Sequence, residues 1–242
     1  MRRLAVAASF LTALPLRVDA DACDVGRSTA CFPLVGAALG AALAGLAALL
    51  ARALPSPLVA VLLVAASAMA TGALHLDGMA DTADGLGGGR DAEHALRIMK
   101  DHAVGAYGAT ALVLALLVKA TALQALIAEG RAMTWLPVAG ALSRWIVVPL
   151  ARLPSARPSG LGGSIAAHVG RAELAAASAL AAGLALGLGG ARGAVVAAAV
   201  AALGAACGAL FRRRLGGVTG DTLGASAELS EALALVLAVG LR

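Results

Sequence analysis

The sequence predicts an all-α fold: a polytopic integral membrane helical bundle of about seven transmembrane helices, with a candidate site at its cytoplasmic face. Hydrophobic residues fill 60% of the 242 positions, and the mean hydropathy is +0.89. Charged residues make up only 14%, whereas soluble domains carry roughly 25%. Apolar runs of about 20 residues, the length that crosses a bilayer as a helix, recur along the chain.

The N-terminal apolar run, residues 1–17, allows two interpretations. Two arginines precede an apolar stretch that reaches Leu16, and small residues follow up to Cys23. This is the pattern of a signal peptide with its cleavage site. The alternative is a short amphipathic or half-inserted helix of the mature protein, from which a polar stretch leads into the first full span.

Seven apolar runs that are long enough to span a membrane follow, at about residues 31–51, 58–76, 109–128, 132–150, 173–191, 193–211 and 223–241. The connections after the first, third and fifth runs are so short that these pairs must be antiparallel hairpins. Most of the 19 Lys and Arg residues then fall on one side, which the positive-inside rule makes cytoplasmic. The net charge of +5 is thus a topology signal, and we expect the lipid bilayer and no nucleic acid as a partner.

Small residues in the spans predict close packing. Glycine pairs with three residues between them occur at Gly36–Gly40, Gly183–Gly187 and Gly204–Gly208, and this spacing lets membrane helices approach closely. The three cysteines are scattered and form no CxxC motif, which favours inert small residues over a disulfide framework or a zinc site.

The polar segment 75–108 interrupts the apolar chain and holds five of the nine aspartates. Asp77, Asp81 and Asp84 recur at spacings of four and three residues, so a helix would place them on one face. Like charges at these spacings destabilise a helix. A divalent cation reverses the sign of that repulsion, and Mg²⁺ prefers one or two carboxylates together with phosphate oxygens. The segment therefore predicts a magnesium and phosphate site.

Residues that follow this acidic face are candidates for phosphate and proton chemistry. Gly87 and Gly88 belong to a glycine triplet, for which we expect a flexible turn with backbone N–H groups that approach phosphate oxygens. Lys100 would neutralise a phosphate oxygen as a compact point charge, and Asp101 would join the metal shell or act as a base. The alternative for Lys100 and Asp101 is a solvated pair at the membrane interface.

Four more candidates lie outside or at the edge of the acidic face. Arg144 and Lys119 fall inside apolar spans, where a charge costs at least a few kcal/mol unless it is paired or hydrated. We expect Arg144 to line a cavity for an anionic substrate, whereas Lys119 has no acidic partner in its own span. Asp221, in a glycine-rich segment, is expected either as a metal ligand from a remote segment or as a helix N-cap. His75 precedes the acidic face and is expected to contact the site by hydrogen bonding.

Four segments together resemble the cobalamin synthase family. They are HLDGMADTADGLGGG from residue 75, IMKDHAVGAYGA from residue 98, ARPSGLGG at 156–163 and GGVTGDTLGASAELSE from residue 216. The sequence FLTALP at 10–15 is similar to the opening of that family, so the likeness runs from residue 10 to about 231. It covers nearly the whole chain, which we treat as a single domain, 1–242.

The resemblance implies a multi-pass enzyme of the bacterial inner membrane whose active site faces the cytoplasm. Members of the family join adenosylcobinamide-GDP to α-ribazole, or to its 5′-phosphate, and release GMP in the last steps of cobalamin assembly, with Mg²⁺ as cofactor. The resemblance leaves open an association with other enzymes of cobalamin assembly, and the sequence sets neither the acceptor nor the oligomeric state.

Combined with this resemblance, the residues above divide into expected roles. The expected metal ligands are Asp77, Asp81, Asp84 and Asp221. The expected phosphate and substrate contacts are Lys100, one of Arg90, Arg144 and Arg157, and His75, Gly87 and Gly88. The proton of the attacking hydroxyl is expected to pass to Asp101 or Asp84.

Two other functions have sequence features in their favour. A CDP-alcohol phosphotransferase also uses spaced aspartates at a membrane face, but its Ala-Arg pair is replaced here by Gly88 and Gly89, and its later Gly-xxx-Asp-xxx-Asp pattern is missing. A transporter would place acidic residues at the membrane midplane. In this sequence we expect the acidic residues at the cytoplasmic ends of the spans, which argues against a transporter.

Overall fold

The computed structural model describes residues 2–16, 18–157 and 168–241. Within these ranges the chain is helical, and its only strand-like feature is an isolated bridge between Ser155 and Val218. The helices are α1 (Arg2–Leu11), α2 (Ala22–Ser28), η1 (Thr29–Cys31), α3 (Phe32–Leu50), α4 (Ser56–Thr71), α5 (Leu74–Gly88), α6 (Ala92–Ile98), α7 (Ala106–Ala128), α8 (Ala132–Trp145), α9 (Val147–Leu150), α11 (Arg171–Leu215) and α12 (Gly220–Gly240). The predicted all-α class is confirmed.

Five helical stretches in the described residues are long and apolar enough to cross a membrane, or six if the bent pair α4 and α5 counts as one span. The five are Ala22–Leu50, Ala106–Ala128, Ala132–Leu150, Arg171–Leu215 and Gly220–Gly240. The chain is therefore a multi-pass membrane protein. The predicted number of seven spans stays a prediction.

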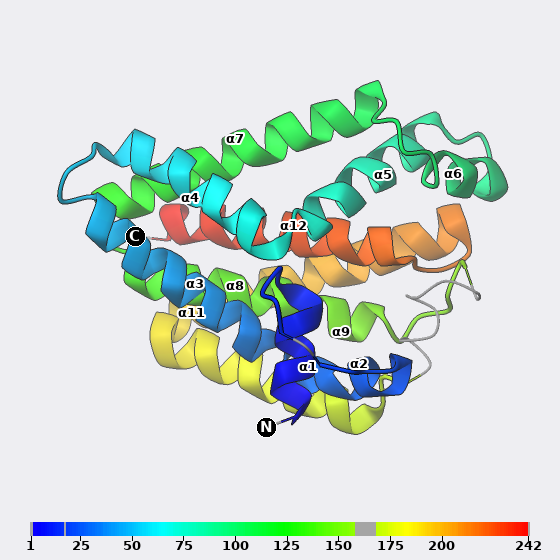
Figure 1. The fold of residues 1–242 in the computed structure, drawn as a ribbon, viewed down its shortest axis with the longest axis horizontal. Coiled ribbons are helices and arrows are strands. Elements are labelled where there is room, and N and C mark those ends of the chain that lie inside the picture. Colours follow the sequence, from blue (N-terminus) through cyan, green and yellow to red (C-terminus); the bar gives the residue numbers. More distant parts are fainter. Residues whose placement is uncertain (1, 17, 158–167, 242) are drawn as a thin grey trace.

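The longest of these stretches, α11, is two helices joined at a sharp break. Gly190 has φ 58° and ψ −142°, a conformation that glycine adopts without steric cost. Beyond the break the chain doubles back (Figure 1), so that a Cβ on Gly193 would overlap the carbonyl of Ala185. The two arms correspond to the predicted spans 173–191 and 193–211.

The predicted span 58–76 ends earlier than expected. Helix α4 stops at Thr71, Gly72 and Ala73 adopt left-handed conformations with φ of 60° and 56°, and α5 leaves at 92° to α4. His75 therefore belongs to the polar helix α5 and not to the apolar span. The glycine triplet is also not the expected turn, because Gly87 and Gly88 are still helical and α5 ends only at Gly88.

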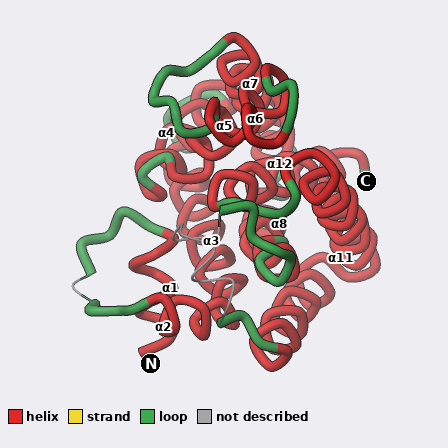
Figure 2. Tube along the Cα trace, turned by 90° about the vertical axis from the view of Figure 1, so that its right-hand side faces the viewer, coloured by secondary structure: helices red, strands yellow, loops and turns green. Residues whose placement is uncertain are grey.

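Helices α8 and α12 occupy the centre of the bundle (Figures 1 and 2). Helix α12 packs on α5, α7, α8 and α11, and α8 packs on α3, α11 and α12. Consistent with this position, the largest side chains that are wholly buried include Phe32, Leu63, Leu126, Leu142, Ile146 and Leu235. The apolar core thus surrounds α12, the helix that begins next to Asp221.

The N-terminal apolar run forms α1, which packs on the domain through the buried side chains of Val6, Ala7 and Leu11. The FLTALP segment begins in the last turn of α1 and continues beyond it. There the N–H of Ala13 donates a hydrogen bond to the carbonyl of Ala70 over 2.8 Å, at the corner between α4 and α5. The signal-peptide and short-helix interpretations of this run both stay predictions.

Glycines allow α3 and α8 to touch backbone to backbone. A Cβ on Gly36 would overlap the carbonyl of Gly140, a Cβ on Gly140 would overlap that of Gly36, and one on Gly40 would overlap the carbonyl of Leu136. The first predicted packing pair is therefore confirmed. By contrast, a Cβ on Gly183 or Gly187 would meet no atom within 4 Å, so that pair is not a packing site within the described chain.

We expect Gly36→Ala to destabilise the protein by about 1–3 kcal/mol, because the added methyl group forces α3 away from α8. The matched control is Gly187→Ala, where space is open and the better helix propensity of alanine adds at most about 1 kcal/mol. Thermal unfolding of the two purified variants in detergent measures the difference. Equal melting temperatures would contradict the close contact.

Candidate active site

A cavity of about 320 Å³ lies between α1, α5, α9 and the start of α12. Apart from Thr29, its polar lining comes from three segments that are far apart in the sequence: the start of α5, the loop after α9 and the start of α12. The polar lining residues of these segments are His75, Asp77, Ser155, Arg157, Thr219 and Asp221. Four of the candidates that the sequence analysis named thus meet here: His75, Asp77, Arg157 and Asp221.

Helices α5 and α12 approach closely because each places a glycine against the backbone of the other. A Cβ on Gly78 would lie 2.7 Å from the carbonyl oxygen of Asp221, and a Cβ on Gly224 would lie 3.3 Å from Cα of His75. Any larger side chain at either glycine would separate α5 from α12. The spacing between Asp77 and Asp221 therefore depends on this contact.

Asp221 stands in the first turn of α12 but is not the N-cap. Thr219 takes that position: its hydroxyl accepts from the N–H of Thr222, and its own N–H donates to the Thr222 hydroxyl. The N-cap alternative for Asp221 is therefore wrong. The Asp221 carboxylate instead accepts a hydrogen bond from Nη1 of Arg157 over 2.9 Å, with both side chains partly exposed to the cavity.

The loop that carries Arg157 is tied to the loop before α12. The N–H of Ala156 donates to the carbonyl of Val218 over 2.9 Å, and the N–H of Val218 donates to the carbonyl of Pro154 over 2.8 Å. Arg157 also donates from Nη2 to the carbonyl of Leu96 over 2.8 Å. The rest of the ARPSGLGG segment, residues 158–163, lies outside the described residues.

Two buried polar atoms of the cavity lining lack a hydrogen-bond partner among the described residues. They are Nδ1 of His75, a side chain only 4% exposed, and Nε of Arg157. Burying a polar group without a partner costs free energy, so such atoms in a cavity wall indicate where a ligand's oxygen atoms would bind.

Asp81 lies one turn beyond Asp77 on α5, and its pKa is raised to about 6. Partial burial is the largest cause, followed by the negative charges of Asp77 and Asp221, which Arg157 offsets only in part. The three carboxylates are therefore close enough to repel one another. In the described part of the chain, no group of three or more His, Cys, Asp or Glu side chains converges tightly enough to hold a metal ion alone.

Asp84 also contributes to the raised pKa of Asp81, as the smallest of the causes, but its carboxylate is bound elsewhere. Its carboxylate accepts from the N–H of Gly105 over 2.7 Å and from that of Gly108 over 2.8 Å, and Gly105 is the N-cap residue of α7. The side chain is only 8% exposed. Asp84 thus caps α7, where a negative charge is also favoured by the helix dipole, and its predicted metal and base roles stay untested.

The remaining candidates from the polar segment lie apart from the cavity lining. Lys100 and Asp101 are exposed in the loop between α6 and α7, where Asp101 accepts a hydrogen bond from the N–H of Ala103 over 3.1 Å. Arg90, Gly87 and Gly88 are exposed at the end of α5. The structure does not bring these five residues together with Asp77 and Asp221.

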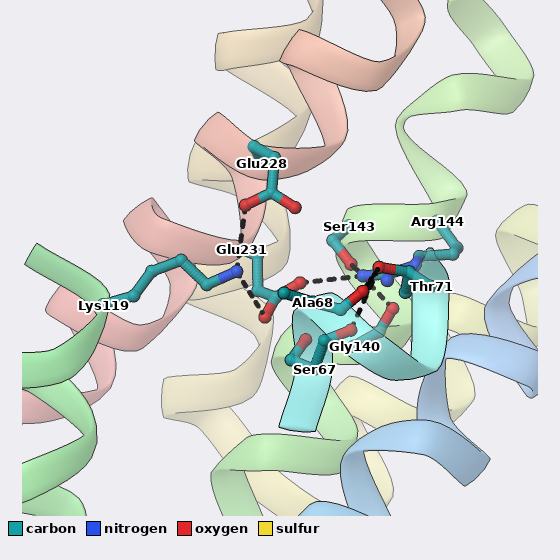
Figure 3. Close-up of polar contacts among 9 residues, drawn as sticks. All are labelled: Ser67, Ala68, Thr71, Lys119, Gly140, Ser143, Arg144, Glu228 and Glu231. Atoms are coloured by element: carbon teal, nitrogen blue, oxygen red, sulfur yellow. Dashed lines mark hydrogen bonds and ion pairs between the residues drawn. The ribbon is translucent and has the colours of Figure 1, made fainter. Parts of the chain in front are cut away.

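Arg144 does not line this cavity either, because it is paired inside the bundle (Figure 3). Its Nη1 donates to Glu231 over 2.8 Å and to the hydroxyl of Ser143 over 2.6 Å. Lys119 lies 3.1 Å from Glu231 and 2.9 Å from Glu228. We call Lys119, Arg144, Glu228 and Glu231 the buried ion network; two positive and two negative side chains make it neutral.

The sequence patterns do not predict this network, because Lys119 has no acidic partner in its own span and the acidic residues are expected at the ends of the spans. Glu228 and Glu231 lie instead in the body of α12 and are nearly buried. Their spacing of three residues places them on one helix face, and that signal, together with two unpaired in-span cations, could have suggested the pairing.

Comparison with known proteins agrees with the sequence resemblance. A family model described as cobalamin-5-phosphate synthase matches residues 3–239. The chain belongs to the cobalamin-5-phosphate synthase family. Its relatives named adenosylcobinamide-GDP ribazoletransferase include one from Geotalea daltonii, 40% identical over 100% of this chain and 98% of the relative. Another, from Pseudomonas aeruginosa, is 43% identical over 98% of this chain and 97% of the relative. No solved structure matches.

The segments that carry the family likeness gather around the cavity. In this member of the family, the segment from residue 75 forms α5, the segment from residue 216 leads into α12, and FLTALP contributes Phe10 and Leu11 to the cavity lining. The segment from residue 98 supplies the start of α7 that Asp84 caps. The likeness thus coincides with the site and its supports.

We expect Asp84→Asn to destabilise the protein by about 1–3 kcal/mol. An amide has a single acceptor oxygen, so one of the two buried N–H groups at the start of α7 would face the NH₂ group instead. The control is Asp77→Asn, an exposed side chain whose replacement should leave the melting temperature unchanged. A loss of stability in the control alone would reverse the assignment of these two aspartates.

We also expect Lys119→Met to be strongly destabilising, by about 3–5 kcal/mol, because it leaves Glu228 buried and without its cation. Adding Glu228→Gln restores neutrality and should recover a large part of the loss. A double-mutant cycle on thermal unfolding measures the coupling. Additive effects of the two substitutions would show that the side chains do not interact.

Proposed function

We propose that the chain joins adenosylcobinamide-GDP to α-ribazole or its 5′-phosphate and releases GMP, and that the cavity is where this transfer occurs. The family and the names of the relatives support the reaction. The single observation that carries the location is the meeting of Asp77, Arg157 and Asp221, from three distant segments, in one wall. We place the site at the cytoplasmic face of a bacterial inner membrane, by the positive-inside rule.

The reaction exchanges one phosphorus–oxygen bond for another. A ribazole hydroxyl attacks the phosphorus nearer the cobinamide, the bond from that phosphorus to the bridging oxygen breaks, and GMP leaves with the bridging oxygen. The hydroxyl proton passes to a base. Such a transfer needs alignment of the two oxygen atoms and neutralisation of the charge on the phosphates, more than covalent help from the protein.

Arg157 and the carboxylates are suited to the charged part of this task. The Nε of Arg157 is a buried donor without a partner among the described residues, available for a phosphate oxygen of the pyrophosphate. Asp77 and Asp221 provide hard oxygen donors from two helices. This set fits Mg²⁺, which is commonly held by one or two carboxylates while phosphate oxygens and water complete its shell.

When bound, Mg²⁺ would supply positive charge next to the phosphates. Side chains of the protein would orient the attacking hydroxyl and accept its proton. His75, through its unpartnered Nδ1, would bind a ribose hydroxyl and orient it. Asp81 lies one turn beyond Asp77 on α5, close enough to feel the charges of Asp77 and Asp221, and would accept the hydroxyl proton. We propose Asp81 for this step ahead of Asp84, whose carboxylate caps α7, and ahead of Asp101, which is exposed in the loop before α7.

The reaction is tested by GMP release from purified protein in lipid nanodiscs, supplied with adenosylcobinamide-GDP and α-ribazole 5′-phosphate. We expect release that requires both substrates and Mg²⁺ and that stops with a chelator. Replacement of Mg²⁺ by Ca²⁺ is a control for which we expect slower GMP release, because the larger Ca²⁺ ion binds its oxygen ligands in a less regular geometry. GMP release that persists without the ribazole substrate would indicate a hydrolase, and release unaffected by chelator would remove the metal from the proposal.

A further inference from the structure

The second wall of the cavity is apolar and has no role in the chemistry above. It faces the cavity with side chains from α1, α3, α5 and α9: Phe10, Leu11, Phe32, Leu74, Val147 and Ala151. The one hydroxyl in this wall belongs to Thr29, and it already donates to the carbonyl of Gly26 over 2.6 Å. The wall thus offers a ligand no free side-chain donor, and its one side-chain acceptor is the Thr29 hydroxyl oxygen.

Aromatic rings are concentrated at this wall. The chain has only three phenylalanines, and two of them line the cavity. The rings of Phe10 and Phe32 stack on each other, with centroids 5.9 Å apart and an angle of 15° between their planes. Phe32 is fixed in the core at 1% exposure, whereas Phe10 is only partly buried, so a face of Phe10 remains for a ligand.

The position of Phe10 is held by the corner of α4 and α5. Three residues further on, the N–H of Ala13 donates to the carbonyl of Ala70, and α5 begins immediately after that corner with Leu74 and His75. The apolar wall and the polar lining are therefore anchored to the same turn of the chain and line one cavity.

We propose that this apolar wall binds the benzimidazole base of ribazole, which stacks on Phe10. This inference rests on the proposed function and names the subsite for one of its two substrates. The base is flat, and its ring carries no exocyclic polar group. No exocyclic group of the base therefore needs a hydrogen bond from this apolar wall. Its ribose would then extend toward His75 and Asp77, where the hydroxyl reacts.

The other parts of the substrates suit this wall less well. Guanine carries donors and acceptors around its edge, and these would be buried without partners against Phe10 and Leu11. The corrin ring with its side chains is far larger than a cavity of about 320 Å³. The acyl chain of a membrane lipid would fit by polarity, and the experiment separates it from the base.

The test measures KM for each substrate in Phe10→Leu, with Phe211→Leu as the control. Phe211 is the third phenylalanine and is buried in α11, away from this cavity. We expect Phe10→Leu to raise KM for α-ribazole 5′-phosphate about tenfold or more, as the loss of base stacking implies, with KM for adenosylcobinamide-GDP unchanged. The control should change neither. A raised KM for adenosylcobinamide-GDP instead, or no change in either, would overturn the proposal.

A binding measurement keeps this inference separate from the proposed function. Calorimetric titration with 5,6-dimethylbenzimidazole alone, in detergent and again in nanodiscs, reports the base subsite without turnover. Binding that weakens in Phe10→Leu but not in Phe211→Leu supports the subsite. Equal binding by both variants, or binding lost in nanodiscs because lipid fills the wall, overturns it. Absent GMP release by the unaltered protein would contradict the proposed function alone.

Discussion

The rest of the structure depends on the buried ion network that joins α12 to α7 and α8. Two cations and two carboxylates lie together at no more than 11% exposure of any side chain. Each charge would cost several kcal/mol in such a place without its partner. A shift of α12 by one turn, about 5.4 Å, would separate Lys119 and Arg144 from Glu228 and Glu231. The network therefore fixes the register of the central helix, more than apolar packing does, because leucine and alanine tolerate sliding in a bilayer.

The register of α12 determines the geometry of the candidate active site. Asp221 is ten residues before Glu231 on the same helix, a distance of about 15 Å, so the position of Glu231 determines where the Asp221 carboxylate lies. The glycine contacts between α5 and α12 then bring Asp77 within electrostatic reach, as the raised pKa of Asp81 indicates. Asp84 adds a second constraint, because it links α5 to the start of α7. The acidic helix is thus supported at both ends and presents only part of its acidic face to the cavity.

Hydropathy and spacing in the sequence were enough to predict the helical membrane class, most span positions and a helix with aspartates on one face. The corner at Gly72 and Ala73 could not be predicted, because apolar residues continue through it and alanine rarely adopts the left-handed conformation that Ala73 has. The separate role of Asp84 was hidden because spacing gives the helix face but not the neighbouring N–H groups. The pairing of Arg144 was hidden for a related reason: its partner is 87 residues away, and charge alone suggested a substrate.

The central claim is that the cavity between α5 and α12, and not the exposed loop before α7, carries out the transfer. Comparing GMP release by Asp221→Asn and Asp101→Asn tests it most directly, because Asp221 lines the cavity and Asp101 is exposed in that loop. Melting temperatures of both variants confirm that each is folded. The account predicts that Asp221→Asn loses at least about 99% of the rate, as the loss of a metal ligand or phosphate contact implies, while Asp101→Asn keeps most of it. Near-normal release by Asp221→Asn, with activity lost in Asp101→Asn, would contradict it.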